Sequence, residues 1–271
     1  MPERKSADPE ERGQAVVEAA LSIPLTTFLI LSIIQLGMMH QAQIMNQLAA
    51  YRAARAGVVN SGSCDLMLNS AMSALIPTFG PTPSVGGFPS ISGRVDSALK
   101  QFEVWSVYKG LNSLTTGLFK FPLVTVEVLN PKKSALNGLF TTYGQHLSNR
   151  EIDFDDVRDA TVVDANLLSV RVKYWYRLRI PFADWQIHTM WVGQQILKYF
   201  RGIQFENQSA FGIGARTASR LNGLKQGGDL AVSSAVATAF RLYYVPIVSV
   251  YTMRMQSNLM LSQVSPCAVD N

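Results

Sequence analysis

The sequence predicts an α+β protein in which a long N-terminal transmembrane helix precedes a domain with a small antiparallel sheet and flanking helices. Two observations support this class. Glu18 is the only charged residue between Arg12 and Arg52, and an uncharged, mainly apolar run extends from Ala19 to Met39. Further along, three segments alternate apolar and polar residues with the period of a β-strand, and amphipathic segments separate them. The 271 residues, 16% of them charged, suffice for one or two domains with a hydrophobic core.

The N-terminal helix is expected over residues 14–59, with its membrane-spanning part at about 15–39. As an α-helix the uncharged run is roughly 30 Å long, which matches the hydrocarbon core of a bilayer. A cleaved secretory signal is the first alternative, but the run is longer than an ordinary signal core and no small-x-small cleavage site follows it. Pro24 lies inside the helix, where it removes a backbone hydrogen bond, so we expect a kink there.

Residues 1–13 form a polar leader that we expect to be disordered and cytoplasmic. The leader carries three basic residues, against Arg52 and Arg55 beyond the apolar run, so the positive-inside bias toward a cytoplasmic N-terminus is small. With that orientation residues 60–271 form a periplasmic domain, and Arg52 and Arg55 mark the membrane exit.

The domain is expected to contain helices at 65–75 and 94–109, a loop at 77–93, and strands at 121–131, 166–181 and 245–257. A long insertion at 182–244 separates the last two strands and holds an aromatic amphipathic helix at 184–201 and another helix at 229–242. The clearest strand has an apolar face and a basic, aromatic face. Their residues are Val170, Val172, Tyr174, Tyr176, Leu178 and Ile180 on the first, and Arg171, Lys173, Trp175, Arg177 and Arg179 on the second.

The motif of greatest functional interest lies at the start of the apolar helix. The basic, polar leader ends at Gly13, and Glu18 follows after four intervening residues. A glycine lets a peptidase approach the backbone closely because it has no side chain. A carboxylate inside a membrane segment is costly without a partner, which gives Glu18 a reason to pair with another charge. The simpler alternative is that Glu18 lies at the headgroup boundary, where the helix dipole also favours an acidic residue.

This arrangement resembles the processing site of type IV pilin-like proteins. The segments RGQAVVEAALSIPLTTFLILSIIQLG (12–37) and QLAAYRAARAGVVNSG (47–62) look like the TadE-like pseudopilins, or minor pilins, of tight-adherence (Flp-type) pilus systems. The later segments VTVEVLNP, VDANLLSVRVKYWYRLRIP and VPIVSVYTMRMQS are similar to longer members of that family. This chain departs from the pattern at Ala19, where an aromatic residue is common, and in its long 182–244 insertion.

The resemblance implies a pilin-like fold and a structural role in assembling or initiating an adhesive pilus. It implies that a prepilin peptidase cuts after Gly13 on the cytoplasmic side, that Gln14 becomes the new N-terminus, and that Glu18 guides docking onto other pilins. The implied partners are the inner membrane, the peptidase and the other pilins of the system. Two alternatives remain: a pseudopilin of a type II-like secretion machine, and an unprocessed single-pass protein with a periplasmic binding domain.

Cys64 and Cys267 are the two cysteines, and both lie on the same side of the apolar run. If that side is periplasmic, an even count in an oxidising compartment indicates one disulfide. Two unpaired buried thiols remain the alternative, since a sequence does not fix pairing.

Other function classes find little support in the residues. The three histidines, His40, His146 and His188, lie outside any catalytic or zinc motif, so we expect no enzyme, metal centre, cofactor or small-molecule substrate. The acidic run REIDFDDVRD (150–159) lacks the glycine and final glutamate of a calcium loop. The basic strand face could stack nucleic-acid bases, but we expect a helix or another subunit to cover it. The net charge of +5 is small and scattered, so we expect no nucleic-acid partner.

Overall fold

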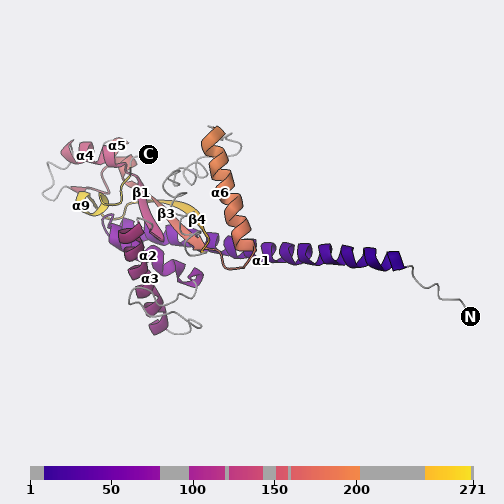
Figure 1. Cartoon of the computed structure of the whole chain (residues 1–271). Coiled ribbons are helices and arrows are strands. Elements are labelled where there is room, and N and C mark those ends of the chain that lie inside the picture. The colour runs from indigo at the N-terminus through magenta and orange to yellow at the C-terminus, as the bar shows by residue number, and fades with distance from the viewer. Residues whose placement is uncertain are drawn as a thin grey trace, which may run out of the picture.

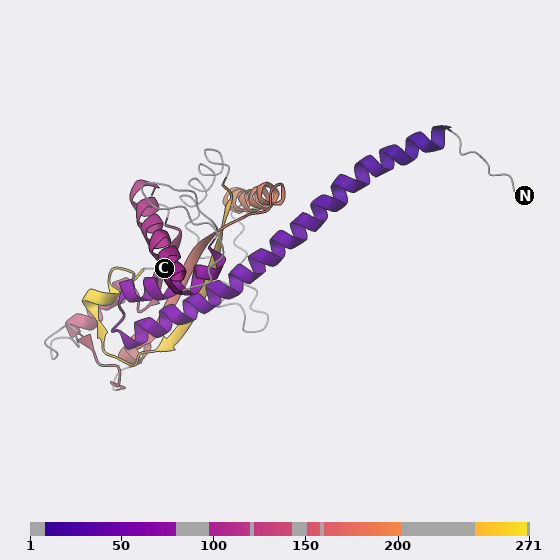
Figure 2. The ribbon, with the colours of Figure 1, turned by 90° about the horizontal axis from the view of Figure 1, so that it is seen from below.

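A single helix, α1 (Pro9–Val59), dominates the shape of the molecule. The computed structural model describes residues 9–79, 98–119, 122–142, 151–157, 160–201 and 242–269. Figures 1 and 2 show α1 projecting from a folded domain that packs along one side of its C-terminal part. The helix starts at Pro9, within the stretch expected to be disordered, because a proline suits the first helical position, where its missing N–H is not needed. It ends before Ser61 and Gly62, whose positive φ angles turn the chain back.

The domain contains the following elements in chain order: α2 (Cys64–Leu75), η1 (Ile76–Thr78), α3 (Ala98–Phe119), β1 (Val124–Asn130), α4 (Lys133–Thr142), β2 (Glu151–Ile152), α5 (Ala160–Ala165), β3 (Leu167–Arg177), α6 (Ala183–Arg201), β4 (Tyr244–Arg254), β5 (Leu259–Met260) and α9 (Leu261–Val264). The predicted α+β class is confirmed, with a long apolar helix ahead of a small antiparallel sheet and helices.

The main sheet has three antiparallel strands in the order β1-β3-β4. The central strand is β3, and its register pairs Val172 with Val126 on one side and with Ser249 on the other. These strands lie where the alternating segments predicted them, because the period-two pattern marks a strand with one face in the core. A second sheet pairs the short strands β2 and β5.

Helices α1 and α2 pack on one face of the main sheet. The apolar face of β3 points into this layer, and Val170, Val172, Tyr174 and Tyr176 are buried there with the alanines of α1. Burial raises the pKa of Tyr174, whose hydroxyl lies 3.3 Å from the hydroxyl of Thr78. The opposite face carries Trp175, which packs edge-to-face against Trp191 of α6. The core therefore lies mainly between the sheet and the α1–α2 pair.

Several helical predictions need correction. Helix α3 continues to Phe119, ten residues beyond the predicted end at Lys109, because the single Gly110 does not break it. Leu99 and Phe102 of this helix are exposed, whereas its buried apolar residues are Val104, Val107 and Tyr108. The sequence reasoning missed α4, α5 and the β2–β5 pair, which are all short. The predicted helix at 229–242 lies almost entirely outside the described residues, as does most of the predicted loop at 77–93.

Candidate functional site

The first part of α1, residues 14–34, is exposed to the surroundings over its whole length. Each of its described side chains is exposed or half-buried, and the exposed fraction reaches 68% at Val16 and 71% at Leu21. Its hydroxyl groups donate to carbonyls of the same helix: Thr26 to Ser22 at 2.9 Å and Ser32 to Phe28 at 2.9 Å. This exposed segment therefore presents a mainly apolar surface, and the hydroxyls of Thr26 and Ser32 are satisfied within the helix, as a lipid environment requires.

The domain begins to cover α1 at Gln35, which is fully buried. The Oε1 atom of Gln35 accepts hydrogen bonds from the backbone N–H groups of Arg179, at 3.1 Å, and Ile180, at 2.9 Å. These two residues lie in the short connection between β3 and α6. A fixed polar contact thus ties α1 to the sheet at the point where the exposed segment ends, inside the stretch that the sequence assigned to the membrane.

From Gln35 to Val59, one side of α1 is lined by small residues that pack against the domain. Ala42, Ala49, Ala50, Ala53 and Ala54 are buried, and so are Gly57 and Val58. Small side chains let α2 and the strands approach the helix axis closely. This packed segment of α1 is therefore part of the hydrophobic core of the domain.

Asn46 fixes the packed segment of α1 on the sheet. Its Nδ2 atom lies 3.1 Å from the carbonyl oxygen of Ile247, 3.1 Å from Oγ of Ser249 and 3.3 Å from the carbonyl oxygen of Val172. The contacts reach both β3 and β4. A buried amide with specific partners sets the rotation of α1 about its axis and its position along that axis. Alanines alone would define both poorly, because they make no directional contacts.

Arg52 and Arg55 lie on the exposed side of the packed segment. At 1.5 Å per residue, Arg52 is about 26 Å along the helix from Gln35. The folded domain packs along this part of α1, so Arg52 and Arg55 lie beside the domain and not at the end of the exposed segment. The sequence pattern could not show that this part of α1 packs on the domain, because an alanine-rich helix packs equally well on a sheet and on another helix.

The residues of the predicted processing motif lie at the far end of α1 from the domain. Gly13 is in the second turn of the helix, Gln14 follows it, and Glu18 is exposed. Pro24 lies within the helix, which continues on both sides of it. The structure brings none of these residues near another element of the described chain. Within the described part of the chain, no other element lies near enough to supply a partner for Glu18.

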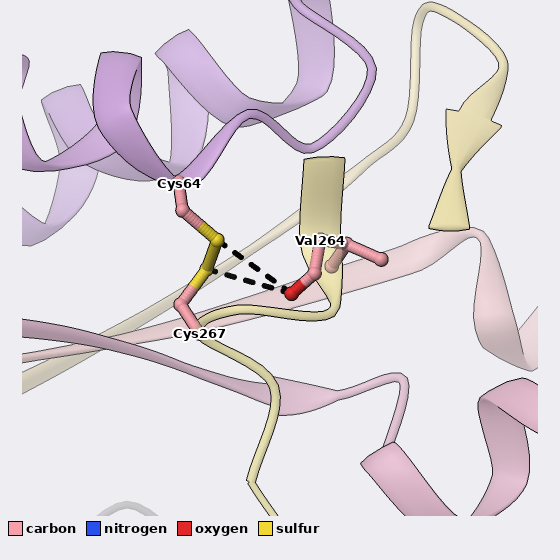
Figure 3. Close-up of a disulfide and its surroundings, with 3 residues drawn as sticks. All are labelled: Cys64, Val264 and Cys267. Carbon is pink, nitrogen blue, oxygen red and sulfur yellow. Dashed lines mark hydrogen bonds between the residues drawn. A yellow bond between two sulfur atoms is a disulfide. The ribbon is translucent and has the colours of Figure 1, made fainter. Parts of the chain in front are cut away.

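Cys64 and Cys267 form a disulfide at the opposite end of the molecule, with their Cα atoms 5.9 Å apart (Figure 3). The carbonyl oxygen of Val264 lies 3.6 Å from each sulfur, and these are van der Waals contacts because a disulfide sulfur carries no hydrogen. The bond links the start of α2 to the C-terminal tail. The tail in turn pairs with the outer edge of β1: the N–H of Val128 donates to Cys267, and the N–H of Val269 donates to Val128.

The basic face of β3 is buried over most of the strand, whereas Arg177 is half-buried and Arg179, just after the strand, is exposed. Arg171, Lys173 and Trp175 are all buried. Both Nε and Nη2 of Arg171 donate to the same carboxylate oxygen of Glu127, at 2.8 and 2.5 Å. The buried part of this face therefore belongs to the fold of the domain, and Trp191 of α6 packs on it.

The described residues show no arrangement typical of catalysis or metal binding. No three His, Cys, Asp or Glu side chains among them gather as metal ligands, although Asp159 of the acidic run is outside the described part. His188 is buried on α6 between the rings of Trp191 and Tyr243, and burial lowers its pKa. An open hollow of about 330 Å³ between α1 and β4 is lined mainly by apolar side chains, with His40 and Gln43 as its polar members. His146 lies outside the described residues.

The fold and this helix define a class of protein. One N-terminal helix is long and apolar enough to cross a membrane, and its most apolar stretch is wholly exposed, which fits a single-pass membrane protein with an α+β domain. A family model described as "TadE-like protein" matches residues 13–55. The chain thus carries a TadE-like segment that starts at Gly13 and ends within the packed segment of α1, consistent with a pilus protein of the TadE-like kind. No curated protein and no solved structure matches the chain.

Proposed function

We propose that this protein is a minor pilin or pseudopilin that supports the assembly or initiation of a tight-adherence pilus. Its role is structural and not enzymatic. The observation that carries the proposal is the division of α1. Residues 14–34 form an apolar helix that nothing in the described chain covers, and the TadE-like match includes all of it. In a pilin the same apolar helix has two successive roles: it first holds the subunit in the membrane and then packs among the helices of other subunits.

The length of the exposed segment supports a membrane-spanning state. From Gln14 to Ile34 an α-helix rises about 31 Å, close to the thickness of the hydrocarbon core. The domain starts at Gln35, so the span that we propose is shorter at its C-terminal end than the 15–39 expected from hydropathy. With this placement the domain rests directly against the membrane surface.

The N-terminal residues support processing by a prepilin peptidase after Gly13. Gly13 lies in the second turn of α1, and a peptidase must unwind that turn to reach the peptide bond. Glycine weakens a helix by about 1 kcal/mol relative to alanine, and the first turn of a helix frays readily. The cut would create a positively charged amino group at Gln14, one helical turn before Glu18.

Glu18 is the residue we propose for docking between subunits. Glu18 is the fourth residue after Gln14, so it would lie about 6 Å into the span, where an unpaired carboxylate is costly. Pairing with the amino group of a neighbouring subunit removes that cost only in the correct register. The exposed position of Glu18 leaves it accessible to such a partner.

The disulfide supports a periplasmic location for the domain. Disulfides form and persist in oxidising compartments such as the periplasm and are rare in the cytosol. Since Cys64 and Cys267 both follow the exposed segment of α1, the domain would be periplasmic and the leader at residues 1–13 cytoplasmic. Incorporation into an extracellular filament is compatible with the same orientation.

The intact mass of membrane-extracted protein tests the processing step. Cells that contain the peptidase should yield a chain that begins at Gln14, and cells without it should yield the full leader. Gly13→Leu should remain uncut, while Gly37→Leu, a matched change in the same helix, should be cut normally. A chain that keeps residues 2–13 in the presence of the peptidase would leave the unprocessed single-pass protein as the better description.

The docking role is tested separately with Glu18→Ala. This variant should be cut after Gly13 but should assemble poorly, as measured by the amount of sheared pili and by crosslinking to other pilins. Glu18→Asp keeps the charge and should retain part of the assembly. Normal assembly of Glu18→Ala would refute the docking role, and loss of protein secretion in place of pili would favour the type II-like alternative.

A further inference from the structure

Helix α6 (Ala183–Arg201) occupies the edge of the domain from which the exposed segment of α1 emerges. In Figure 1 it crosses the direction of α1, with the sheet on one side and the exposed segment on the other; in Figure 2 it is seen nearly end-on beside α1. α6 contacts α1, and the connection just before it binds Gln35 through Arg179 and Ile180. Its position relative to the start of the exposed segment is therefore fixed by hydrogen bonds.

The two faces of α6 differ in burial, and the exposed one carries two large apolar residues beside the polar Thr189 and Gln194. Toward the sheet, Ala183 and His188 are buried and Trp191 packs on Trp175. On the opposite side, Trp185 is 59% exposed and Met190 is 60% exposed. A helix that only covers a sheet in water carries mainly polar residues on its second side. The two large apolar side chains are therefore the part of this side that a partner surface would cover.

Phe182, immediately before α6, adds to this exposed face. Its side chain is 72% exposed, and its φ of 69° lies in the left-handed region that aromatic residues rarely adopt. Such a conformation costs about 1–2 kcal/mol relative to an ordinary one. Packing in the core does not offset this cost, because most of the Phe182 side chain is exposed. An exposed aromatic ring held in a strained conformation indicates a functional contact.

We propose that α6 lies on the outer surface of the inner membrane, with Phe182, Trp185 and Met190 inserted at the boundary between headgroups and acyl chains. The proposal rests on the membrane-spanning role of residues 14–34. If that segment crosses the bilayer, Gln35 is at the membrane surface, and α6, which crosses the direction of the span at that level, runs along the surface. Its exposed face then points toward the lipid.

The chemistry of this face suits a bilayer interface better than water or a second protein. Tryptophan is enriched where headgroups meet acyl chains, because its ring is apolar and its N–H still finds a polar partner. A helix of 19 residues is about 28 Å long, so it would form a long contact beside the span. This contact would hold the domain at a fixed tilt and rotation above the membrane before the subunit enters a pilus.

Quenching of tryptophan fluorescence by brominated lipids tests the proposal. The full chain is reconstituted in phosphatidylcholine vesicles with bromine either high in the acyl chain or near its end. We expect quenching that is stronger with bromine near the headgroups and that is largely lost in Trp185→Phe. Trp105→Phe is the matched control: Trp105 is half-buried on α3, which packs against α2, and its loss should leave the lipid quenching in place.

Flotation of the same vesicles separates this proposal from the proposed anchor. If the chain floats with the vesicles but Trp185→Phe leaves the quenching unchanged, the interfacial role of α6 is wrong and the anchor stands. If the chain does not float, the membrane-spanning role fails and the interfacial role falls with it. If Trp185 emission shifts to the blue as the protein density rises, without bromine quenching, the face binds another copy of the chain and the lipid proposal is overturned.

Discussion

Gly57→Ala probes the packing that joins α1 to the domain. Gly57 lies in the packed segment of α1, two residues before the helix ends. A Cβ atom at this position would lie 2.6 Å from Cδ2 of Leu168 and 2.6 Å from Sδ of Met67. Carbon atoms in contact normally approach to about 3.5–4.0 Å. Both neighbours are fully buried, and Leu168 lies on the central strand of the sheet.

The expected loss of stability follows from two opposed effects. Inserting a methyl group into a well-packed core costs about 1–3 kcal/mol. Alanine is the better helix former by about 1 kcal/mol. Met67 is flexible and can move its sulfur, but Leu168 is confined by the strand. We therefore expect Gly57→Ala to lower the free energy of unfolding by up to about 2 kcal/mol.

Urea unfolding of the full chain in mild detergent, followed by the fluorescence of buried Trp175, measures this change. Gly138→Ala is the matched control, because Gly138 is exposed in the middle of α4 and its added Cβ meets nothing within 4 Å. The control should gain up to about 1 kcal/mol from helix propensity. If Gly57→Ala stabilises the protein as much as the control does, the close approach of α1 to β3 is wrong.

Three further predictions concern the domain. Replacing Cys64 and Cys267 together by serine opens a loop with a sequence separation of 203, and the chain-entropy relation gives a loss of roughly 5 kcal/mol in urea unfolding; a loss under about 1 kcal/mol would contradict it. Glu127→Ala leaves the buried guanidinium of Arg171 without its carboxylate and should cost about 3 kcal/mol, most of which Arg171→Met should restore in the double variant; an unchanged midpoint would show that the pair is dispensable. Burial lowers the pKa of His188 below its ordinary 6.5, so unfolding takes up a proton and stability should fall as the pH drops below about 6.5; His188→Gln should flatten this slope, and an equal slope in both proteins would assign it to other groups.

Several elements could be predicted from local patterns alone. The uncharged run after Glu18 predicted a long apolar helix, and three alternating segments predicted the strands, because each pattern reflects a repeat of the backbone itself. The aromatic helix at 184–201 was also found, since its amphipathic pattern extends over several turns. By contrast, α5 and the β2–β5 pair are too short for their residues to show a helical or strand period.

The sequence by itself determined that α1 exists, that it is apolar enough for a membrane, and that Gly13 and Glu18 stand at the spacing of a processing motif. Only the tertiary structure decided that α1 is divided at Gln35 and that Arg52 and Arg55 lie beside the domain. It also decided that α6 exposes Trp185 and Met190 next to the exposed segment of α1. The physical reason is that hydropathy reflects only how unfavourable it is to expose a side chain to water. Whether lipid or protein replaces that water depends on contacts between residues far apart in the chain, such as those of Gln35 with Arg179 and Ile180.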